Sequence, residues 1–143
     1  MVNIQNEFNN RFSETEKEIE FEYKNFQGQQ LVIEDYSELE SLYLLNNKNV
    51  DRVILRNLEQ LEECEIFNCG MKNLIIENCP QIKKIDIRNN SLTSLDFLAS
   101  LENLEELEID DNTEVNSGLK YLPRSLKKFS YKNTDLTEFL KSN

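Results

Sequence analysis

The chain has 143 residues, of which 27 are acidic and 16 basic, giving a formal net charge of -11. This length allows one domain with a buried core, and the negative charge argues against nucleic acids and anionic membranes as partners. A partner protein with a basic surface fits the charge better. Since no stretch approaches roughly 18 consecutive apolar residues and the start lacks the apolar run of a secretory signal, the sequence predicts a cytoplasmic protein.

Residues 1–17 precede the repetitive part of the chain. Ile4, Phe8 and Phe12 are four residues apart, a spacing that places them on one face of a helix. We expect this helix to cover the open end of the repeats that follow, because an uncovered core would favour aggregation. A membrane-surface or peptide-binding helix is the alternative, but membrane-surface helices are rich in basic residues and this segment is not.

From residue 18 onward the chain repeats one phrase, with its clearest copies reading LEECEIFNC, MKNLIIENC and IKKIDIRNN. Copies of the main series follow one another at 21 or 22 residues and begin at Glu18, Leu39, Leu61, Ile82, Leu104 and Leu126. A second series lies between them, at Gly28, Val50, Met71 and Leu92. Apolar residues alternate at positions 4 and 6, which indicates a β-strand and outweighs the helical leucine spacing of LENLEELEI because it recurs between copies.

The phrase L-x-x-L-x-L-x-x-[N/C] resembles the leucine-rich repeat, and its doubled form is similar to the short repeats of bacterial internalin-type and fungal repeat-rich proteins. The resemblance implies an α/β protein by convention that is mostly β. Its fold would be a right-handed solenoid of parallel strands with about six coils over residues 18–143, closed by a short N-terminal capping helix. The resemblance also allows a structural or targeting role inside a larger signalling or ubiquitin-ligase-like protein.

Stacking of such copies would align their inward side chains in columns. Position 4 forms one column, made of Leu42, Cys64, Ile85, Leu107 and Phe129. Position 9 follows each strand, where an inward side chain can bond backbone groups that the sheet leaves unpaired. We expect this role for Asn47, Cys69, Asn90, Asn112 and Thr134.

No second cap follows the last copy in the sequence. Phe129 and Tyr131 therefore have little chain left to cover them. Three interpretations stay open: the last copy closes on itself, the chain belongs to a longer protein, or two copies of the chain meet end to end.

The sequence offers few groups for catalysis or metal binding. It contains no histidine and three glycines, and the spacing of Cys64, Cys69 and Cys79 fits no zinc or thioredoxin motif. No cofactor and no metal site is therefore expected, and the odd number of cysteines favours reduced thiols. The run from Asp110 to Glu114 lacks the pattern of a calcium-binding loop. Carboxylate-based glycan hydrolysis is the least favoured alternative, because it needs a deep pocket where the pattern predicts an open sheet.

Positions 3, 5 and 7 of each strand point outward, and most of them are polar. Tyr43, Leu45 and Phe67 are the exceptions, and they lie on neighbouring strands of the predicted sheet. We therefore predict a non-catalytic module that recognises another protein through an apolar patch with a charged rim. The predicted rim consists of Glu63, Glu65, Lys84, Asp86 and Arg88. The alternative is that a flanking loop or the N-terminal helix covers the patch.

The second series carries its own apolar row. Its outward position 5 reads Val32, Ile54 and Ile75 in three successive copies, with Arg52 and Arg56 beside Ile54. An exposed row of this kind could serve self-association. The sequence thus predicts either a monomer or a weak homodimer.

Overall fold

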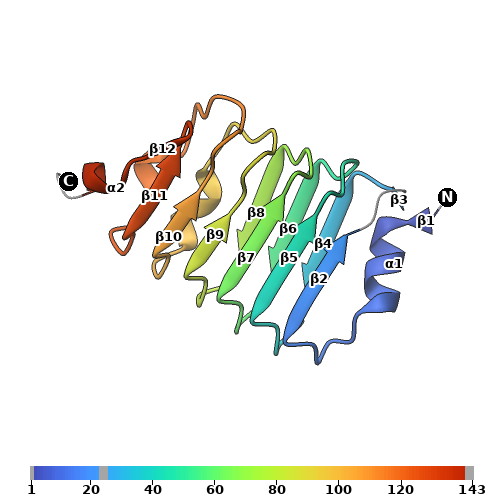
Figure 1. The fold of residues 1–143 in the computed structure, drawn as a ribbon. Coiled ribbons are helices and arrows are strands. Elements are labelled where there is room, and N and C mark those ends of the chain that lie inside the picture. The colour runs from blue at the N-terminus through green and yellow to red at the C-terminus, as the bar shows by residue number, and fades with distance from the viewer. Residues whose placement is uncertain (1, 23–25, 141–143) are drawn as a thin grey trace.

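The computed structural model describes residues 2–22 and 26–140, apart from the side chain of Phe139. These residues form a mostly β structure of the α/β class, in which parallel strands make the sheets and a short helix lies at the N-terminal end (Figure 1). The strands follow one another along the length of the molecule, and the two termini lie at its opposite ends (Figure 1).

The larger sheet has seven strands in the order β12-β11-β10-β9-β7-β5-β2. Its members are β2 (Glu18–Glu22), β5 (Ser41–Leu45), β7 (Glu63–Phe67), β9 (Lys84–Asp86), β10 (Glu106–Glu108), β11 (Lys128–Tyr131) and β12 (Thr134–Asp135). All neighbouring strands are parallel except β12, which runs antiparallel to β11. The sheet is therefore mixed, whereas the sequence predicted parallel strands throughout.

Equivalent residues of successive copies lie beside each other in this sheet. Leu42 is in register with Cys64, Cys64 with Ile85, and Ile85 with Leu107. Phe129 continues the row beside Leu107, and all five side chains are buried. The predicted column is confirmed, and full burial of one such aliphatic or aromatic side chain stabilises the fold by about 1.5–3 kcal/mol.

The smaller parallel sheet contains β4 (Gln30–Glu34), β6 (Arg52–Arg56) and β8 (Asn73–Glu77). The copy that begins at Leu92 adds no fourth strand to it. In place of strands, the second series continues as two short 3-10 helices, η1 (Asp96–Ser100) and η2 (Leu119–Tyr121). The molecule therefore has two kinds of second side, a sheet in its N-terminal half and short helices in its C-terminal half.

A close backbone approach joins η1 to η2. Ser94 and Ser117 form a single parallel bridge, and Gly118 follows with a φ of 93°. A Cβ at Gly118 would lie 2.4 Å from the carbonyl carbon of Leu95. Only glycine suits this position, because it alone tolerates both the positive φ and the contact.

The predicted N-terminal helix is confirmed as α1 (Ile4–Arg11), although it is shorter than the predicted segment 1–17. The Asn3 side chain caps it by accepting a hydrogen bond from the Asn6 amide at 3.1 Å. Ile4 and Phe8 are buried, and Phe12 packs against the same core. Before and after the helix, the short strands β1 (Val2–Asn3) and β3 (Phe26–Gln27) pair in parallel.

The helix also provides hydrogen-bond partners for the backbone at the outer edge of the smaller sheet. The Gln5 side chain donates from Nε2 to the Val32 carbonyl oxygen at 2.8 Å, and its Oε1 accepts from the Val32 amide at 2.7 Å. The primary amide thus takes the place of a neighbouring strand at the centre of β4. An edge strand occupied in this way is less available for pairing with another chain.

The turn role predicted for position 9 holds for four of the five residues. Asn47 is buried and donates from Nδ2 to the Phe21 carbonyl oxygen at 3.1 Å. Cys69 and Asn112 bond carbonyl oxygens of the copy before them in the same way. The prediction is wrong for Thr134, which is exposed in β12, because the chain turns back there and runs antiparallel to β11.

Asn90 shows this role most fully. Its Nδ2 donates to the carbonyl oxygens of Ile66 at 2.7 Å and Ile87 at 3.0 Å. Its Oδ1 accepts from the amides of Cys69 at 3.1 Å and Met71 at 3.2 Å. One buried side chain therefore satisfies backbone groups of two successive copies.

Position 8 forms ladders that the repeat pattern did not predict. Asn46, Asn68 and Asn89 all have positive φ values, a conformation that asparagine tolerates well. Asn68 donates to Asn46 at 2.8 Å, Asn89 donates to Asn68 at 3.2 Å, and Asn46 donates to the Glu22 carboxylate at 2.8 Å. A second ladder joins Asn78, Asn57 and Asp35. Both ladders end at a carboxylate, which can only accept.

The described residues after β11 cover the last copy of the repeat. β12 folds back on β11, the Leu136 amide donates to the Phe129 carbonyl oxygen at 2.7 Å, and the helix α2 (Thr137–Leu140) packs against β11. Phe129 is consequently buried, and Tyr131 is half-buried. This arrangement corresponds to the self-closing interpretation.

Candidate protein-binding site

Strands β5 and β7 bring the predicted apolar patch together. Leu45 lies directly beside Phe67, and Tyr43 lies beside Glu65. Because alternate residues of a strand face the same side, these side chains share the outward face of the larger sheet. Phe67 is 38% exposed, whereas Tyr43 and Leu45 are half-buried. The covering of the patch that we considered from the sequence therefore does not extend to Phe67.

Arg88 borders the patch on the far side of β7. Its guanidinium carbon lies 5.8 Å from the centre of the Phe67 ring, within the range of a cation–π interaction. The aromatic ring thus already has one cation over its face. Lys84, another predicted rim residue, forms a surface ion pair with Glu63 at 3.5 Å.

Two carboxylates flank Tyr43 across the sheet. Glu20 lies beside it on β2, and Glu65 lies beside it on β7. Among the described residues, neither carboxylate has a cation within ion-pair distance. Burial, followed by the charge of Asp86, raises the pKa of Glu65 above its ordinary value. This part of the sheet therefore disfavours further negative charge and favours an added cation.

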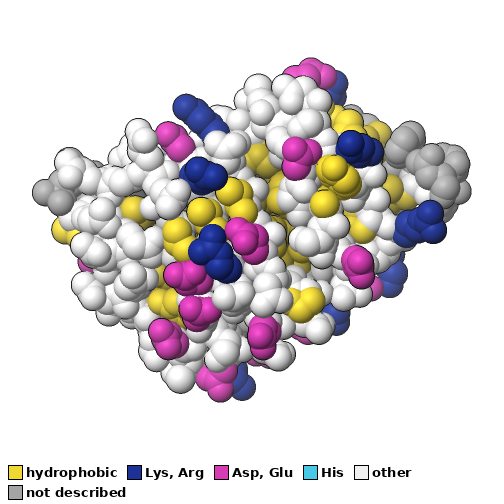
Figure 2. Space-filling model, turned by 180° about the vertical axis from the view of Figure 1, so that it is seen from behind, with side chains coloured by type: hydrophobic (Ala, Val, Ile, Leu, Met, Phe, Trp, Pro, Cys, Tyr) yellow, Lys and Arg dark blue, Asp and Glu magenta, His cyan; other side chains and the backbone are white. Residues whose placement is uncertain are grey.

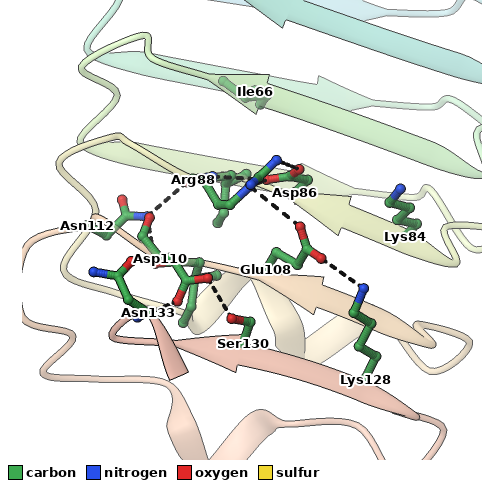
Figure 3. Close-up of polar contacts among 12 residues, drawn as sticks. Ile66, Lys84, Asp86, Arg88, Glu108, Asp110, Asn112, Lys128, Ser130 and Asn133 are labelled. Carbon is green, nitrogen blue, oxygen red and sulfur yellow. Dashed lines mark hydrogen bonds and ion pairs between the residues drawn. The ribbon is translucent and has the colours of Figure 1, made fainter. Parts of the chain in front are cut away.

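Asp86 was predicted as an outward charge of the rim, and its environment differs from that prediction. It does lie on the outward face beside Glu65, but it is only 2% exposed. Arg88 encloses this carboxylate. The Nε and Nη2 atoms of Arg88 each donate to Asp86 at 2.9 Å, and the Arg88 backbone amide donates at 3.2 Å (Figure 3). These bonds also raise the pKa of Arg88. Asp86 and Arg88 thus form a mutual pair rather than two free rim charges.

The network continues onto strands that the sequence did not assign to the site. Glu108 forms ion pairs with Arg88 at 3.5 Å and with Lys128 at 3.1 Å (Figure 3). The register places Glu108 directly beside Asp86 on the next strand. Both Glu108 and Lys128 occupy outward positions of the repeat phrase, but nothing in the phrase indicates which charges meet.

Asp110 has a structural role. One of its carboxylate oxygens accepts a hydrogen bond from the Ser130 hydroxyl, and the other accepts from the Asn133 amide at 2.7 Å (Figure 3). It therefore fixes the turn after β11. Within residues 2–22 and 26–140, no group of three or more acidic or cysteine side chains is arranged to hold a metal ion.

The predicted self-association row is aligned but poorly exposed. Val32 is in register with Ile54, and Ile54 with Ile75, across the smaller sheet. Ile54 is buried at 8% exposure, and the other two are half-buried. Arg56, which borders the row, bridges Glu34 at 3.2 Å and Glu77 at 3.4 Å. The row is therefore only partly exposed, and self-association through it stays a prediction.

The three thiols are placed for packing. Cys64, Cys69 and Cys79 are all free and buried. Burial raises the pKa of Cys69 to about 11 and raises the pKa values of Cys64 and Cys79 as well. A buried thiol with a raised pKa is a poor nucleophile, because the thiolate is the reactive form.

Two open hollows lie away from the predicted patch. One of about 700 Å³ lies between α1 and β4, and one of about 640 Å³ lies beside η2 and α2. Neither is lined by a residue of the predicted partner-binding set. In the described part of the chain, every helix is too short or too polar to cross a membrane.

Comparison with known proteins adds no family: no protein-family model, curated protein or solved structure matches this chain.

Proposed function

We propose that this chain is a right-handed leucine-rich-repeat solenoid of about six coils that recognises another protein without catalysis. Support for the winding comes from the in-register pairing of residues 21 to 23 positions apart, from Ile19 through Leu42 and Cys64 onward. The two sheets use alternate segments of the chain, as a continuous winding requires. A cytoplasmic setting is part of the proposal, and three buried free thiols support it.

The observation that carries the recognition proposal is the exposed Phe67 ring, on the same face of the sheet as Glu20 and Glu65, which form no ion pair among the described residues. Phe67 and Leu45 offer apolar contact, and Tyr43 lies between Glu20 and Glu65. An arginine or lysine of a partner could stack on Tyr43 and pair with either carboxylate. The proposed ligand is therefore a basic segment with an apolar anchor.

Rigid presentation would give this surface its affinity. Tyr43, Leu45, Glu65 and Phe67 stand on β5 and β7, which are paired with a strand on both sides, so little conformational entropy is lost when a partner binds. Glu20 and Glu65 would mainly speed association and select the sign of the partner, because exposed charges act on the encounter. Binding should accordingly weaken at high salt.

Capture experiments with a surface variant test the proposal. Wild type and Tyr43→Ala/Phe67→Ala are immobilised and exposed to cell lysate, and the retained proteins are identified by mass spectrometry. The proposal expects basic proteins that wild type retains at low salt and the variant loses. Thermal unfolding checks that the variant stays folded.

A second variant serves as the matched control. Val2→Ala/Lys72→Ala changes two exposed side chains outside the larger sheet and should retain the same proteins as wild type. Identical protein lists for wild type and Tyr43→Ala/Phe67→Ala would reject this surface. If the surface binds as proposed, one retained protein should associate more slowly with Glu20→Gln/Glu65→Gln than with wild type.

A further inference from the structure

Charge is distributed unevenly along the chain. Residues 1–40 contain ten acidic and three basic residues, a net charge of -7, whereas residues 119–143 contain two acidic and six basic residues, a net charge of +4. The two termini lie at opposite ends of the molecule (Figure 1). A strongly acidic protein therefore has one end that is locally basic.

The basic end also exposes apolar side chains. Leu119 is 42% exposed and Tyr121 is 38% exposed, both on η2. The neighbouring hollow of about 640 Å³ is lined by Leu119, Leu122, Leu126 and Leu140 together with Lys120 and Arg124. Figure 2 shows Lys or Arg and hydrophobic side chains together at the end of the molecule next to the grey C-terminal residues.

The two cations at this hollow differ from their neighbours. Within the described residues, neither Lys120 nor Arg124 forms an ion pair. The six other described cations after residue 80 all do, namely Lys83, Lys84, Arg88, Lys127, Lys128 and Lys132. The Lys120 ammonium lies over the Tyr121 ring, at 5.1 Å from the ring centre. In a chain with so many carboxylates, two cations without a carboxylate partner among the described residues, beside an apolar hollow, indicate an acidic ligand.

The opposite end has the complementary character. The hollow of about 700 Å³ between α1 and β4 is lined by Glu14, Glu34 and Asp35, with Phe12 and Val32 as apolar members. Arg56 also lines it, but Glu34 and Glu77 already bind its guanidinium. The N-terminal end thus presents carboxylates around a small apolar floor.

We propose that the basic C-terminal hollow binds the acidic N-terminal end of a second copy of this chain, so that copies associate head to tail. The contact joins two different surfaces and leaves one of each free, so it can extend into open-ended chains. It does not use Tyr43 or Phe67, and it is independent of the recognition function proposed above. In such a chain the outward face of the larger sheet would be displayed repeatedly, which raises avidity for a multivalent partner.

Sedimentation velocity over a range of protein concentrations tests this contact. At about 0.1 M salt the Debye length is about 10 Å, which weakens repulsion between distant parts of two acidic copies but not the attraction across a contact. We expect the average mass to rise with protein concentration at this salt. At about 1 M salt, with a Debye length of about 3 Å, the mass should return to that of the monomer.

Two variants of equal net charge separate a specific contact from general repulsion. Lys120→Glu/Arg124→Glu should raise the concentration needed for association at least about tenfold. Lys48→Glu/Lys72→Glu makes the same charge change at two exposed positions outside the hollow and should leave it close to the wild-type value. Monomers at every concentration, or equal effects of the two variants, would overturn the proposal.

A mixing experiment tests the head-to-tail direction. Glu14→Lys/Glu16→Lys makes the N-terminal end more basic, and alone it should not associate. Mixed in equal amounts with Lys120→Glu/Arg124→Glu, it should restore the increase in mass. The unchanged basic hollow of one variant then meets the unchanged acidic end of the other, and the two charge-reversed surfaces can also pair. If mixing restores nothing while wild type still associates, the contact is not head to tail and the proposal is wrong.

Discussion

The N-terminal and C-terminal halves of the larger sheet satisfy their outward charges differently. On β9, β10 and β11, Arg88 and Lys128 are paired with carboxylates of the same face. On β2 and β7, Glu20 and Glu65 have no such partner among the described residues. Paired charges are already neutralised, so Glu20 and Glu65 have more to offer a charged partner than the carboxylates of β9 and β10.

The two halves also differ in the backbone behind this sheet. The N-terminal half has a second sheet of three strands, whereas the C-terminal half has η1 and η2, joined through Gly118. The same repeat phrase therefore tolerates different second sides, provided that its inward columns stay continuous. The following changes test how far the halves are independent.

The largest expected effect is at the contact that joins η1 to η2. Gly118→Ala adds a Cβ 2.4 Å from the Leu95 backbone at a φ of 93°, and we expect it to lower the free energy of unfolding by about 4 kcal/mol. Gly70→Ala is the control in the N-terminal half, because its φ is also positive but its nearest contact is 3.5 Å away. It should cost about 1 kcal/mol. Urea unfolding measures both, and equal losses would show that the close approach does not matter.

The next effect concerns the residue that joins the two halves. Asn90→Ala removes five hydrogen bonds, among them those to buried backbone groups of Cys69, Met71 and Ile66. We expect a loss of about 3 kcal/mol in the free energy of unfolding. Asn103→Ala, which removes one exposed bond to the Pro80 carbonyl oxygen, should cost about 0.5 kcal/mol. A small effect at Asn90 would mean that bound water replaces its amide.

The smallest effects should have opposite signs in the two halves. Glu108→Gln breaks the pairs with Arg88 and Lys128 and should lower the free energy of unfolding by about 0.5 kcal/mol at neutral pH. Glu65→Gln removes a carboxylate that forms no ion pair among the described residues, and we expect it to raise that free energy by no more than about 1 kcal/mol after allowance for solvent screening.

The gain from Glu65→Gln should depend on pH. Because the pKa of Glu65 is raised in the folded protein, the folded state keeps its proton in a window above the ordinary value of 4.5 where the unfolded state has lost it. Wild-type stability therefore falls as pH rises through this window, and the gain should vanish well below pH 4.5. Thermal unfolding across pH measures it, and a gain that persists in acid would assign the effect to packing.

Much of the strand arrangement was predictable because each copy repeats the same local rule. Alternation at positions 4 and 6 placed Leu42, Cys64 and Ile85 in one buried column, and the structure agrees. The exposed Phe67 beside Leu45 followed from the same alternation. The ladder of Asn46, Asn68 and Asn89 had a visible signal, an asparagine before position 9 in successive copies, that the turn conformation explains only afterwards.

Other features had no local signal. Asp86 occupies an outward position yet is buried, because Arg88 two residues later folds back to enclose it. The closure of the C-terminal end likewise depends on how β12 and α2 pack on β11.

By itself, the amino-acid sequence determined which residues face inward, the spacing at which copies stack, and the scarcity of catalytic groups. These are consequences of a two-residue period and of composition, which act within one copy. Only the tertiary structure decided which charges meet, where the second sheet gives way to η1 and η2, and how the last strand is covered. Those outcomes depend on contacts between copies that lie some 20 residues apart, and no rule within a single copy encodes them.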